Sequence, residues 1–305
     1  MPEPLLSFYG SSVNTSNTLK IGVPKGSLQE ATFGLFRKAG FHFTVSGRSY
    51  TPSVDDPELE PLMLRPQEMP QYVAKGILDC GLTGYDWLCD CGADLRIVCR
   101  MTYGKQTLNP IRIVLAVQKD GPIKSVQDLQ GRRIATEYVK LTERFLAEKG
   151  IEASVEFSWG ADEVKVPDLV DAIVVNTETG SSLKAHNLVI LETLMESTTV
   201  LVANEAAWTD PWKRAKLENL SMLLQGALNA ESLVGLKMNV PADRQDEIKA
   251  LLPALKKPTI SPLADEGWVA FEVVLEEKAV RDLIPELKRA GAEGLVEYPL
   301  NKVIY

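Results

Sequence analysis

Short apolar segments alternate with helical patterns through most of this chain, and this alternation limits the fold more than any other feature. The first pair is LKIGVP, a predicted strand, followed by SLQEATFGLFRKAG, a predicted helix. The helix places Leu28, Leu35, Phe36 and Ala39 on one face, as expected for a helix that covers a sheet. Gly40 follows that helix, and glycine is common just beyond a helix end. The pair is therefore one strand–helix unit of an α/β fold.

Further units of the same kind follow along the chain. The predicted strands are LEPLMLR, CGLTG, IRIVLAVQ, RRIATEY, ASVEFSW and DAIVV, and the predicted helices include PQEMPQYVAKG and KLTERFLAEKG. Strands that alternate with helices are typical of α/β folds with largely parallel sheets. At 305 residues the chain exceeds the size at which one core usually divides, so we expect two or three domains.

The pattern changes near residue 223, after the helix-like segment DPWKRAKLENLSMLLQGAL. From there the predicted order is strand, helix, strand, strand, helix, strand, which is the ferredoxin-like βαββαβ order. Both helices have the apolar spacing that covers one face of a sheet. The apolar positions are Ile248, Leu251, Leu252 and Leu255 in the first helix, and Val280, Leu283, Ile284 and Leu287 in the second. We therefore expect a small separate domain at this end.

The charge and hydropathy of the chain exclude two classes of function. The 33 basic and 41 acidic residues give a net charge of −8, which is unsuited to a general nucleic-acid surface. No apolar run approaches the roughly 18 residues that a membrane-spanning helix needs. Residues 1–18 have neither a basic start nor a full apolar segment, so we expect a flexible tail and a cytoplasmic protein. Any phosphate site must then be local.

The cysteines predict reduced thiols better than they predict a metal site. The potential soft ligands are Cys80, Cys89, Cys91, Cys99, His42 and His186. The cysteines lack paired CxxC spacing, although two of them are separated by a single residue and could contribute to a metal site. Buried reduced thiols fit a cytoplasmic protein. The two histidines are expected on a strand face and on a helix surface.

The segment DAIVVNTETGSSL, residues 171–183, runs from a buried strand through a small polar loop into a helix-like stretch. Gly180 lies there among the hydroxyl side chains of Thr179, Ser181 and Ser182. Backbone N–H groups of such a loop can converge on an anion at the start of a helix. The alternative is an ordinary turn in which Ser181 or Ser182 caps the helix. The segment by itself leaves both interpretations open.

The wider context of this loop resembles a known family. DAIVVNTETGSSLKAHNL and the preceding GADEVKVPDLV are similar to the phosphoribosyl-diphosphate loop of the ATP phosphoribosyltransferase family. Colinear blocks such as LKIGVPKGSLQEA, LMLRPQEMPQYVAKGILDCGLTGYDWL and DLQGRRIATEY extend the resemblance over roughly residues 19–305. It implies two α/β lobes hinged like a type II periplasmic binding protein, with the active site in the cleft. It also implies the C-terminal ferredoxin-like regulatory domain of the family's long form.

The resemblance and the change of pattern together divide the chain. We expect a flexible tail at 1–18, lobe I at 19–104 with a return segment at about 199–222, lobe II at 105–198, and a regulatory domain at 223–305.

The resemblance implies the reaction that opens histidine biosynthesis. A ring nitrogen of adenine in ATP attacks the anomeric carbon of phosphoribosyl diphosphate, and pyrophosphate leaves together with Mg²⁺. The attacking lone pair is unprotonated at neutral pH, so no Ser-His-Asp arrangement is needed. Catalysis should rest on the alignment of two substrates and on cations that stabilise the leaving group. Histidine is the implied allosteric inhibitor, and a homohexamer is the implied assembly.

The resemblance also assigns residues to the two substrates. The residues implied for phosphoribosyl diphosphate are Asp171, Asn176, Thr177, Glu178, Thr179, Gly180, Ser181 and Ser182. The residues implied for ATP are Lys25, Gly26, Arg65, Thr83, Gly84 and Asp86. Glu163 matches a glutamate beside the cleft that could receive the proton lost from the adenine amine. No protein ligand to the metal is assigned.

Each of these assignments has a simpler structural alternative. Lys25 could be a solvated loop lysine, Arg65 a partner in a surface ion pair, and Asp86 the N-cap of a helix. Glu163 could lie on an exposed loop, and Asp171 could cap the entry to its strand.

The chain departs from the family pattern at two places. Val175 stands where the family usually has an acid that accepts hydrogen bonds from the ribose hydroxyls. Asn176 is the nearest polar substitute, although adjacent strand residues point to opposite faces. Val139 and Lys140 stand where Pro-Asn is frequent, which could reshape the cleft loop or add a charge that faces phosphate. A non-catalytic two-lobed sensor of small anions is therefore the alternative function, because the same fold would serve both.

Overall fold

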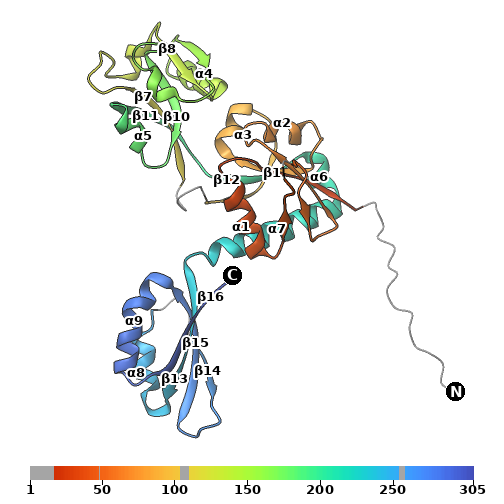
Figure 1. Ribbon diagram of the computed structural model, residues 1–305, viewed down its shortest axis with the longest axis vertical. Coiled ribbons are helices and arrows are strands. Elements are labelled where there is room, and N and C mark those ends of the chain that lie inside the picture. The colour runs from red at the N-terminus through yellow and green to blue at the C-terminus, as the bar shows by residue number, and fades with distance from the viewer. Residues whose placement is uncertain (1–16, 48, 104–109, 254–257) are drawn as a thin grey trace, which may run out of the picture.

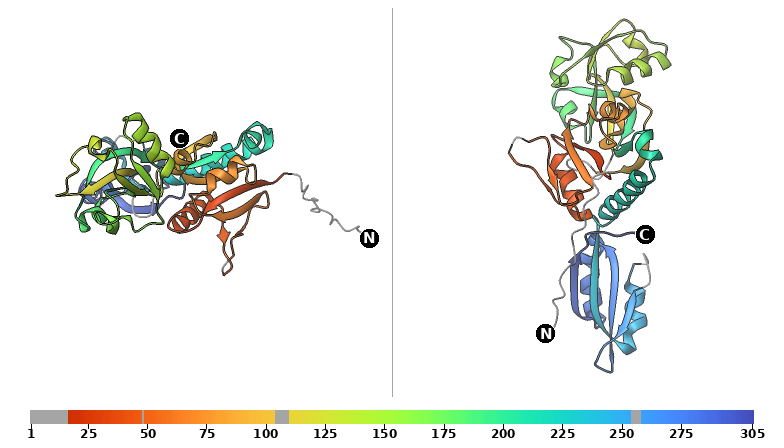
Figure 2. Two further views of the ribbon diagram at one scale, coloured as in Figure 1. Left: turned by 90° about the horizontal axis from the view of Figure 1, so that it is seen from above. Right: turned by 90° about the vertical axis from the view of Figure 1, so that its right-hand side faces the viewer.

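The computed structural model describes residues 17–47, 49–103, 110–253 and 258–305. Nearly all of the expected flexible tail, Leu255 and the expected lobe boundary at 104–105 lie outside these residues. The described chain forms three bodies in a row, with lobe I between lobe II and a third domain (Figures 1 and 2).

Lobe I is built on a five-stranded sheet of order β4-β1-β5-β12-β6. Its strands are β1 (Leu19–Pro24), β4 (Leu59–Leu64), β5 (Cys80–Gly84), β6 (Arg96–Met101) and β12 (Thr199–Ala203). Its helices are α1 (Gln29–Ala39), α2 (Met69–Ala74), α3 (Tyr85–Cys91), α6 (Glu205–Thr209) and α7 (Pro211–Asn229), and a small hairpin adds β2 (Phe43–Thr44) and β3 (Ser53–Val54). The predicted first strand coincides with β1, and α1 ends at a left-handed Gly40.

Lobe II has a second five-stranded sheet, of order β11-β7-β10-β8-β9. Its strands are β7 (Ile111–Gln118), β8 (Arg133–Thr136), β9 (Ser154–Phe157), β10 (Ala172–Thr177) and β11 (Leu188–Ser197). The helices are α4 (Val139–Glu148) and the short α5 (Ser181–Ala185), and two 3-10 turns are η1 (Val126–Leu129) and η2 (Asp162–Lys165).

The α/β class is confirmed, but the expectation of largely parallel sheets is wrong. Each lobe has two parallel and two antiparallel strand pairings among its described strands. In lobe I the antiparallel strand is β12, which lies between β5 and β6. It arrives directly from lobe II, since β11 ends at Ser197 in one sheet and β12 begins at Thr199 in the other. A strand that arrives from lobe II enters the lobe I sheet at the edge where β1, β4 and β5 end. It therefore runs antiparallel to its neighbours.

The third domain confirms the predicted βαββαβ order. Its elements are β13 (Leu233–Pro241), η3 (Ala242–Arg244), α8 (Gln245–Leu251), β14 (Thr259–Pro262), β15 (Trp268–Glu276), α9 (Glu277–Arg289) and β16 (Glu293–Pro299). The sheet order is β14-β15-β13-β16, with antiparallel neighbours throughout. Ile248 from α8 and Val280, Leu283 and Leu287 from α9 are buried in one cluster with Phe271 of β15. The two amphipathic helices thus cover the same face of the sheet.

Lobe I and the third domain are joined at two places. Helix α7 extends to Asn229, so the change of pattern near residue 223 falls inside a helix, and the third sheet begins at Leu233. The end of the chain then returns to lobe I. Val303 N–H donates to the carbonyl of Gly226 in α7 at 2.8 Å. Lys302 Nζ donates to the carbonyl of Ala39 at the end of α1 at 2.9 Å.

Two other expectations concern membrane helices and the cysteines. No helix in the described part of the chain combines the length and apolarity needed to cross a membrane. All four cysteines are free thiols; Cys80 and Cys99 are buried, and Cys89 and Cys91 are partly buried. Within the described ranges, no three cysteine, histidine or acidic side chains converge as a metal site would require.

The two faces of β15 lead to a stability prediction. Phe271 is fully buried, whereas Val274 is 39% exposed on the opposite face. Phe271→Ala leaves a cavity and should destabilise the third domain by about 3–5 kcal/mol, and Val274→Ala by less than about 1 kcal/mol. Hydrogen exchange of the strand amides in this domain measures both effects separately from the lobes. Equal losses in the two variants would contradict this packing.

Candidate active site

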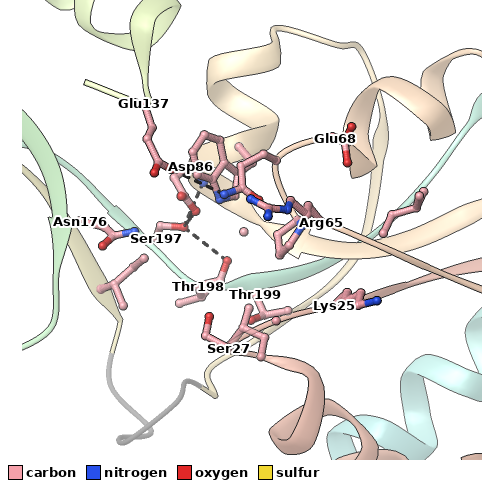
Figure 3. Close-up of a pocket in the computed structure, with 18 of the residues that line it drawn as sticks. Lys25, Ser27, Arg65, Glu68, Asp86, Glu137, Asn176, Ser197, Thr198 and Thr199 are labelled. Carbon is pink, nitrogen blue, oxygen red and sulfur yellow. Dashed lines mark hydrogen bonds between the residues drawn. The ribbon is translucent and has the colours of Figure 1, made fainter. Parts of the chain in front are cut away.

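A cavity of about 900 Å³ lies between the two lobes (Figure 3). Lobe I contributes the loop that follows β1, the loop that follows β4 and the start of α3 directly after β5. These three strands are parallel, so their carboxyl ends meet at the same edge of the sheet, where α/β folds usually bind ligands. The residues of lobe I that line the cavity include Lys25, Gly26, Ser27, Arg65, Gln67, Glu68, Gly84, Asp86 and Trp87.

The opposite wall comes from lobe II and from the crossing between the lobes. Its residues include Ile111, Glu137, Asn176, Thr177, Glu178, Ser197, Thr198 and Thr199. The cavity therefore exists only where both lobes are present.

Asp86 is a buried carboxylate at this cavity, with 1% of its surface exposed. Helix α3 has Gly84 as its N-cap residue, so the alternative role of Asp86 as the cap is not realised. Its Oδ1 accepts a hydrogen bond from Ser197 Oγ at 2.5 Å, and its own N–H donates to the same Oγ at 2.9 Å. Burial raises the pKa of Asp86, and hydrogen bonds from Ser197 and Tyr138 oppose that rise.

The hydrogen bonds at Asp86 continue into lobe II. Tyr138, just before α4, is buried and bonds to Asp86, and it also accepts a hydrogen bond from Asn176 Nδ2 at 3.0 Å. The ring of Tyr138 stacks on Trp87 of α3, with 4.2 Å between the ring centroids. Burial raises the pKa of Tyr138 well above its ordinary value. Asn176, Tyr138, Asp86 and Ser197 thus form one polar network that spans both lobes.

Two cations reach the cavity from lobe I. Lys25 lies over the ring of Tyr50, with Nζ 3.4 Å from the ring centroid. Arg65 is exposed at the cavity wall, and within the described residues it has no carboxylate partner. The alternative of a surface ion pair is therefore not realised for Arg65. These positive charges are local, as an acidic chain with a phosphate site requires.

The glycines and Thr83 shape this wall. A Cβ on Gly84 would lie 2.1 Å from Asp86 Oδ1, so only glycine leaves room for the carboxylate. Gly26 has φ of 101°, a backbone region that favours glycine. Thr83 is fully buried and does not line the cavity; its Oγ1 donates to the carbonyl of Pro66 at 2.7 Å. Thr83 therefore supports the loop that carries Arg65.

The polar loop after β10 is only partly at the cavity. Thr177 and Glu178 line it, whereas Thr179, Gly180, Ser181 and Ser182 continue beyond the lining residues into α5. The N-cap of α5 is Gly180, with φ of 75°, so neither serine takes the capping position of an ordinary turn.

Glu163 and Asp171 lie away from the cavity lining. Glu163 Oε1 accepts a hydrogen bond from Ser182 Oγ at 2.6 Å, which ties η2 to the polar loop. Asp171 precedes β10, at the end of the strand opposite to the loop. Its carboxylate accepts a hydrogen bond from the N–H of Arg133 at 2.9 Å and pairs with Arg132 at 3.4 Å. This placement agrees with the structural alternative, in which Asp171 caps the start of β10.

The residues that depart from the family pattern lie away from the cavity or point to a protein partner. Val175 packs against the apolar cluster of lobe II rather than into the cavity. Asn176 turns toward Tyr138. Lys140 is exposed at the start of α4 and is not among the lining residues.

Sequence reasoning missed several residues at this site. Glu137, Tyr138, Ser197 and Thr199 were not singled out; the first two lie in the block DLQGRRIATEY, but nothing in that block marks them as site residues. The run of hydroxyl residues ESTTV was a usable signal, since it interrupts two apolar stretches where the chain crosses between lobes.

The raised pKa of Asp86 predicts a pH dependence of stability. A raised pKa means that ionisation destabilises the folded state; the cost is full above the folded-state pKa and vanishes below the ordinary value of 3.8. Asp86→Asn removes this cost, so the stability of the variant relative to the unchanged chain should rise from pH 3.5 to pH 7. Urea unfolding at several pH values measures it.

Asp55 provides a control of opposite sign. The backbone N–H of His42 and then its side chain lower the pKa of this exposed carboxylate. Asp55→Asn should therefore lose stability relative to the unchanged chain as the pH rises. Parallel pH profiles for the two variants would contradict the assignment.

Comparisons with known proteins agree with this architecture. The family model described as ATP phosphoribosyltransferase matches residues 65–226, and the model described as the HisG C-terminal domain matches residues 230–302. The ATP phosphoribosyltransferase of Pelotomaculum thermopropionicum is 62% identical over 286 residues, which are 94% of this chain and 99% of that protein. The ATP phosphoribosyltransferase of Chlorobaculum parvum is 57% identical over 95% of this chain and 99% of that protein.

A solved structure adds to this agreement. The ATP phosphoribosyl transferase (HisG:HisZ) complex from Thermotoga maritima contains a chain that is 28% identical, with a TM-score of 0.59 over 68% of this chain and 99% of that one. The cavity between two lobes, the third domain and these similarities together place the chain in the ATP phosphoribosyltransferase family.

Proposed function

We propose that this chain transfers the phosphoribosyl group of phosphoribosyl diphosphate to the adenine ring of ATP and releases pyrophosphate. The observation that carries the proposal is the cavity between the lobes, which has Lys25 and Arg65 on one wall and the 176–178 part of the polar loop on the other. Its volume of about 900 Å³ lies toward the upper end of the usual range for ligand pockets.

The reaction needs alignment more than it needs a protein base. The attacking ring nitrogen of adenine already has a free lone pair, so the walls must hold it in line with the anomeric carbon. ATP is proposed on the lobe I side, near Asp86 and the two cations. Phosphoribosyl diphosphate is proposed on the lobe II side, with its 5′-phosphate at residues 179–182. Holding both reactants removes much of the entropic cost of their encounter.

Charge stabilises the leaving pyrophosphate. Lys25 and Arg65 are the cavity cations that can approach its oxygens and offset the negative charge that develops there. Lys25 lies close to Tyr50, and its flexible stem lets the ammonium move from the ring to a phosphate.

We propose Mg²⁺ as a companion of the diphosphate rather than a resident of the protein. The described side chains supply no cluster of three potential metal ligands, and Mg²⁺ commonly binds through substrate phosphates with one or two carboxylates. The ion would neutralise charge on the leaving group. The residues named above position the organic parts of the substrates.

Regulation and assembly are further parts of the proposal. We propose that histidine inhibits the enzyme through the third domain, that the assembly is a homohexamer, and that the enzyme works in the cytoplasm. The separate ferredoxin-like domain, joined to lobe I at α7 and at the chain's end, supports a regulatory site remote from the cavity. Membership of this family favours catalysis over the alternative of a two-lobed anion sensor.

The decisive experiment is turnover. The full chain incubated with ATP, phosphoribosyl diphosphate and Mg²⁺ should form phosphoribosyl-ATP and pyrophosphate, and added histidine should slow the reaction. Arg65→Ala removes a charge-assisted phosphate contact worth about 1.5–3 kcal/mol, so kcat/KM should fall about ten- to over a hundredfold. The melting temperature should stay unchanged.

A matched arginine outside the cavity controls this result. Arg281 in the third domain is 86% exposed, and Arg281→Ala should leave kcat/KM unchanged. If Arg65→Ala also left it unchanged, the cavity wall would not contact substrate phosphates.

The polar loop gives a second prediction. Gly180 has φ of 75°, which a valine adopts only with strain, so Gly180→Val should distort the turn that follows Glu178. Ser181→Ala removes only one exposed hydroxyl. The affinity for phosphoribosyl diphosphate, measured by calorimetry, should fall far more in the glycine variant. Normal affinity in Gly180→Val would remove the loop from the phosphate site.

A further inference from the structure

Helix α3 of lobe I and helix α4 of lobe II meet at the lobe junction, and each supplies a side chain to an end of the other. Asp90 Oδ1 in α3 accepts a hydrogen bond from the N–H of Leu141, in the first turn of α4, at 2.9 Å. In return, the guanidinium of Arg144 in α4 donates to the carbonyl of Cys89 in the last turn of α3. We call this pair of hydrogen bonds the α3–α4 contact.

Both bonds satisfy backbone groups that a helix cannot pair by itself. The first N–H groups and the last carbonyls of a helix have no intrahelical partner. The N-cap side chain usually accepts the N–H of the second or third helical residue. Within the described chain, Tyr138 at the N-cap position of α4 makes no such side-chain bond, and Leu141 is the third residue of the helix. Asp90 therefore supplies, from lobe I, the cap that α4 lacks.

The charges of the α3–α4 contact also suit the two helix ends. A carboxylate is favourable at the start of a helix, where the N–H groups leave a partial positive charge, and a cation is favourable at the end. Asp90 lies at the start of α4, and Arg144 lies at the end of α3. The contact is therefore a matched pair of caps that crosses from one lobe to the other.

The same two helices carry the polar network of the cavity. Asp86 lies four residues before Asp90, on the same face of α3, and it bonds to Tyr138 directly before α4. Trp87 of α3 packs against the apolar cluster of lobe II, as Leu141 does. The α3–α4 contact thus lies one helical turn beyond the network, and any movement at the contact is passed to the cavity walls.

The backbone between the lobes does not by itself fix the angle between them. The chain passes from one lobe to the other through the segment between β6 and β7, and again at Thr198 between β11 and β12. Short connecting segments of this kind are where hinge motions occur. The relative orientation of the walls then depends on side-chain contacts between the lobes, of which the Asp90 cap is one.

We propose that Asp90 is a positioning residue, which caps α4 from lobe I and so holds the two walls of the cavity at the separation that the reaction needs. Neither Asp90 nor Leu141 lines the described cavity, so the effect is exerted through the orientation of the lobes. The inference rests on the proposed function, since the two substrates are placed on opposite walls. A displacement of about 1 Å between reacting groups can lower a rate about a hundredfold.

The activity test separates turnover from binding. Asp90→Ala removes the acceptor of the Leu141 N–H, and kcat should fall about five- to thirtyfold, the ratio that corresponds to the loss of one helix cap. The affinity for ATP alone, measured by calorimetry, should change by less than about threefold, because ATP is proposed on the lobe I wall. Asp90→Asn keeps a side-chain oxygen for the same N–H and should keep kcat within about twofold of the unchanged chain.

Asp210→Ala is the matched control. Asp210 caps α7 by accepting the N–H groups of Trp212 and Lys213 at 2.9 Å, but all three residues belong to lobe I. Loss of this cap should lower the melting temperature, while kcat measured well below that temperature stays unchanged. A fall in kcat that only follows a loss of stability would therefore appear in Asp210→Ala as well.

Hydrogen exchange tests the α3–α4 contact without substrates. The N–H of Asp86 donates to Ser197 Oγ at the end of β11 in lobe II, and as the second residue of α3 it has no intrahelical acceptor. Its exchange therefore reports separation of the lobes. Exchange at Asp86 should be at least about fivefold faster in Asp90→Ala than in the unchanged chain, and unchanged in Asp210→Ala.

Three results would each overturn the inference. They are an unchanged kcat in Asp90→Ala, an equal fall of kcat in Asp210→Ala, and unchanged exchange at Asp86 in Asp90→Ala. Failure of the proposed function is a separate observation, because it appears as an absence of phosphoribosyl-ATP when the unchanged chain receives both substrates. In that case the exchange result alone decides whether Asp90 holds the lobes together.

Discussion

The hydrogen-bond network of Asn176, Tyr138, Asp86 and Ser197 is the constraint on which the candidate site depends. Each lobe has its own sheet and core, and the cavity forms only where the lobes meet. A buried carboxylate is tolerated there because donors from both sides surround it. Gly84 keeps the space that the carboxylate occupies. The stacking of Trp87 on Tyr138 adds an apolar contact at the same junction. The polar network and this stacking contact thus both hold the two walls together.

Both cations of the cavity lie on one wall, whereas acidic side chains lie on both walls. Lys25 and Arg65 come from loops of lobe I, whereas Glu178 belongs to the wall of lobe II. A substrate that carries phosphate groups can meet both cations at the wall of lobe I. The chain has a net charge of −8, and Lys25 and Arg65 supply the local positive charge that a phosphate group needs at this wall.

The sequence predicted the α/β class, the first strand–helix unit and the order of strands and helices in the third domain, because their apolar spacing is regular. It did not reveal β6, β11 or β12, whose pairing depends on the crossings between lobes rather than on local pattern. The motif residues Lys25, Arg65 and Asp86 do line the cavity, whereas Tyr138 and Ser197 became visible only through contacts across it. The buried Glu178 oxygen that has no hydrogen-bond partner is likewise a property of the folded loop, and no pattern of residue types predicts it.

The position of β12 between β5 and β6 has a consequence for the order of folding during synthesis. Lobe II is continuous, and its last strand ends at Ser197, so its sheet can be completed once that residue has emerged. β5 and β6 do not pair with each other, and they are joined only when residues 199–203 insert between them. Domains generally fold in the order of their synthesis. Here the first part of lobe I leaves the ribosome before lobe II, yet the lobe I sheet can be completed only after the last strand of lobe II has emerged.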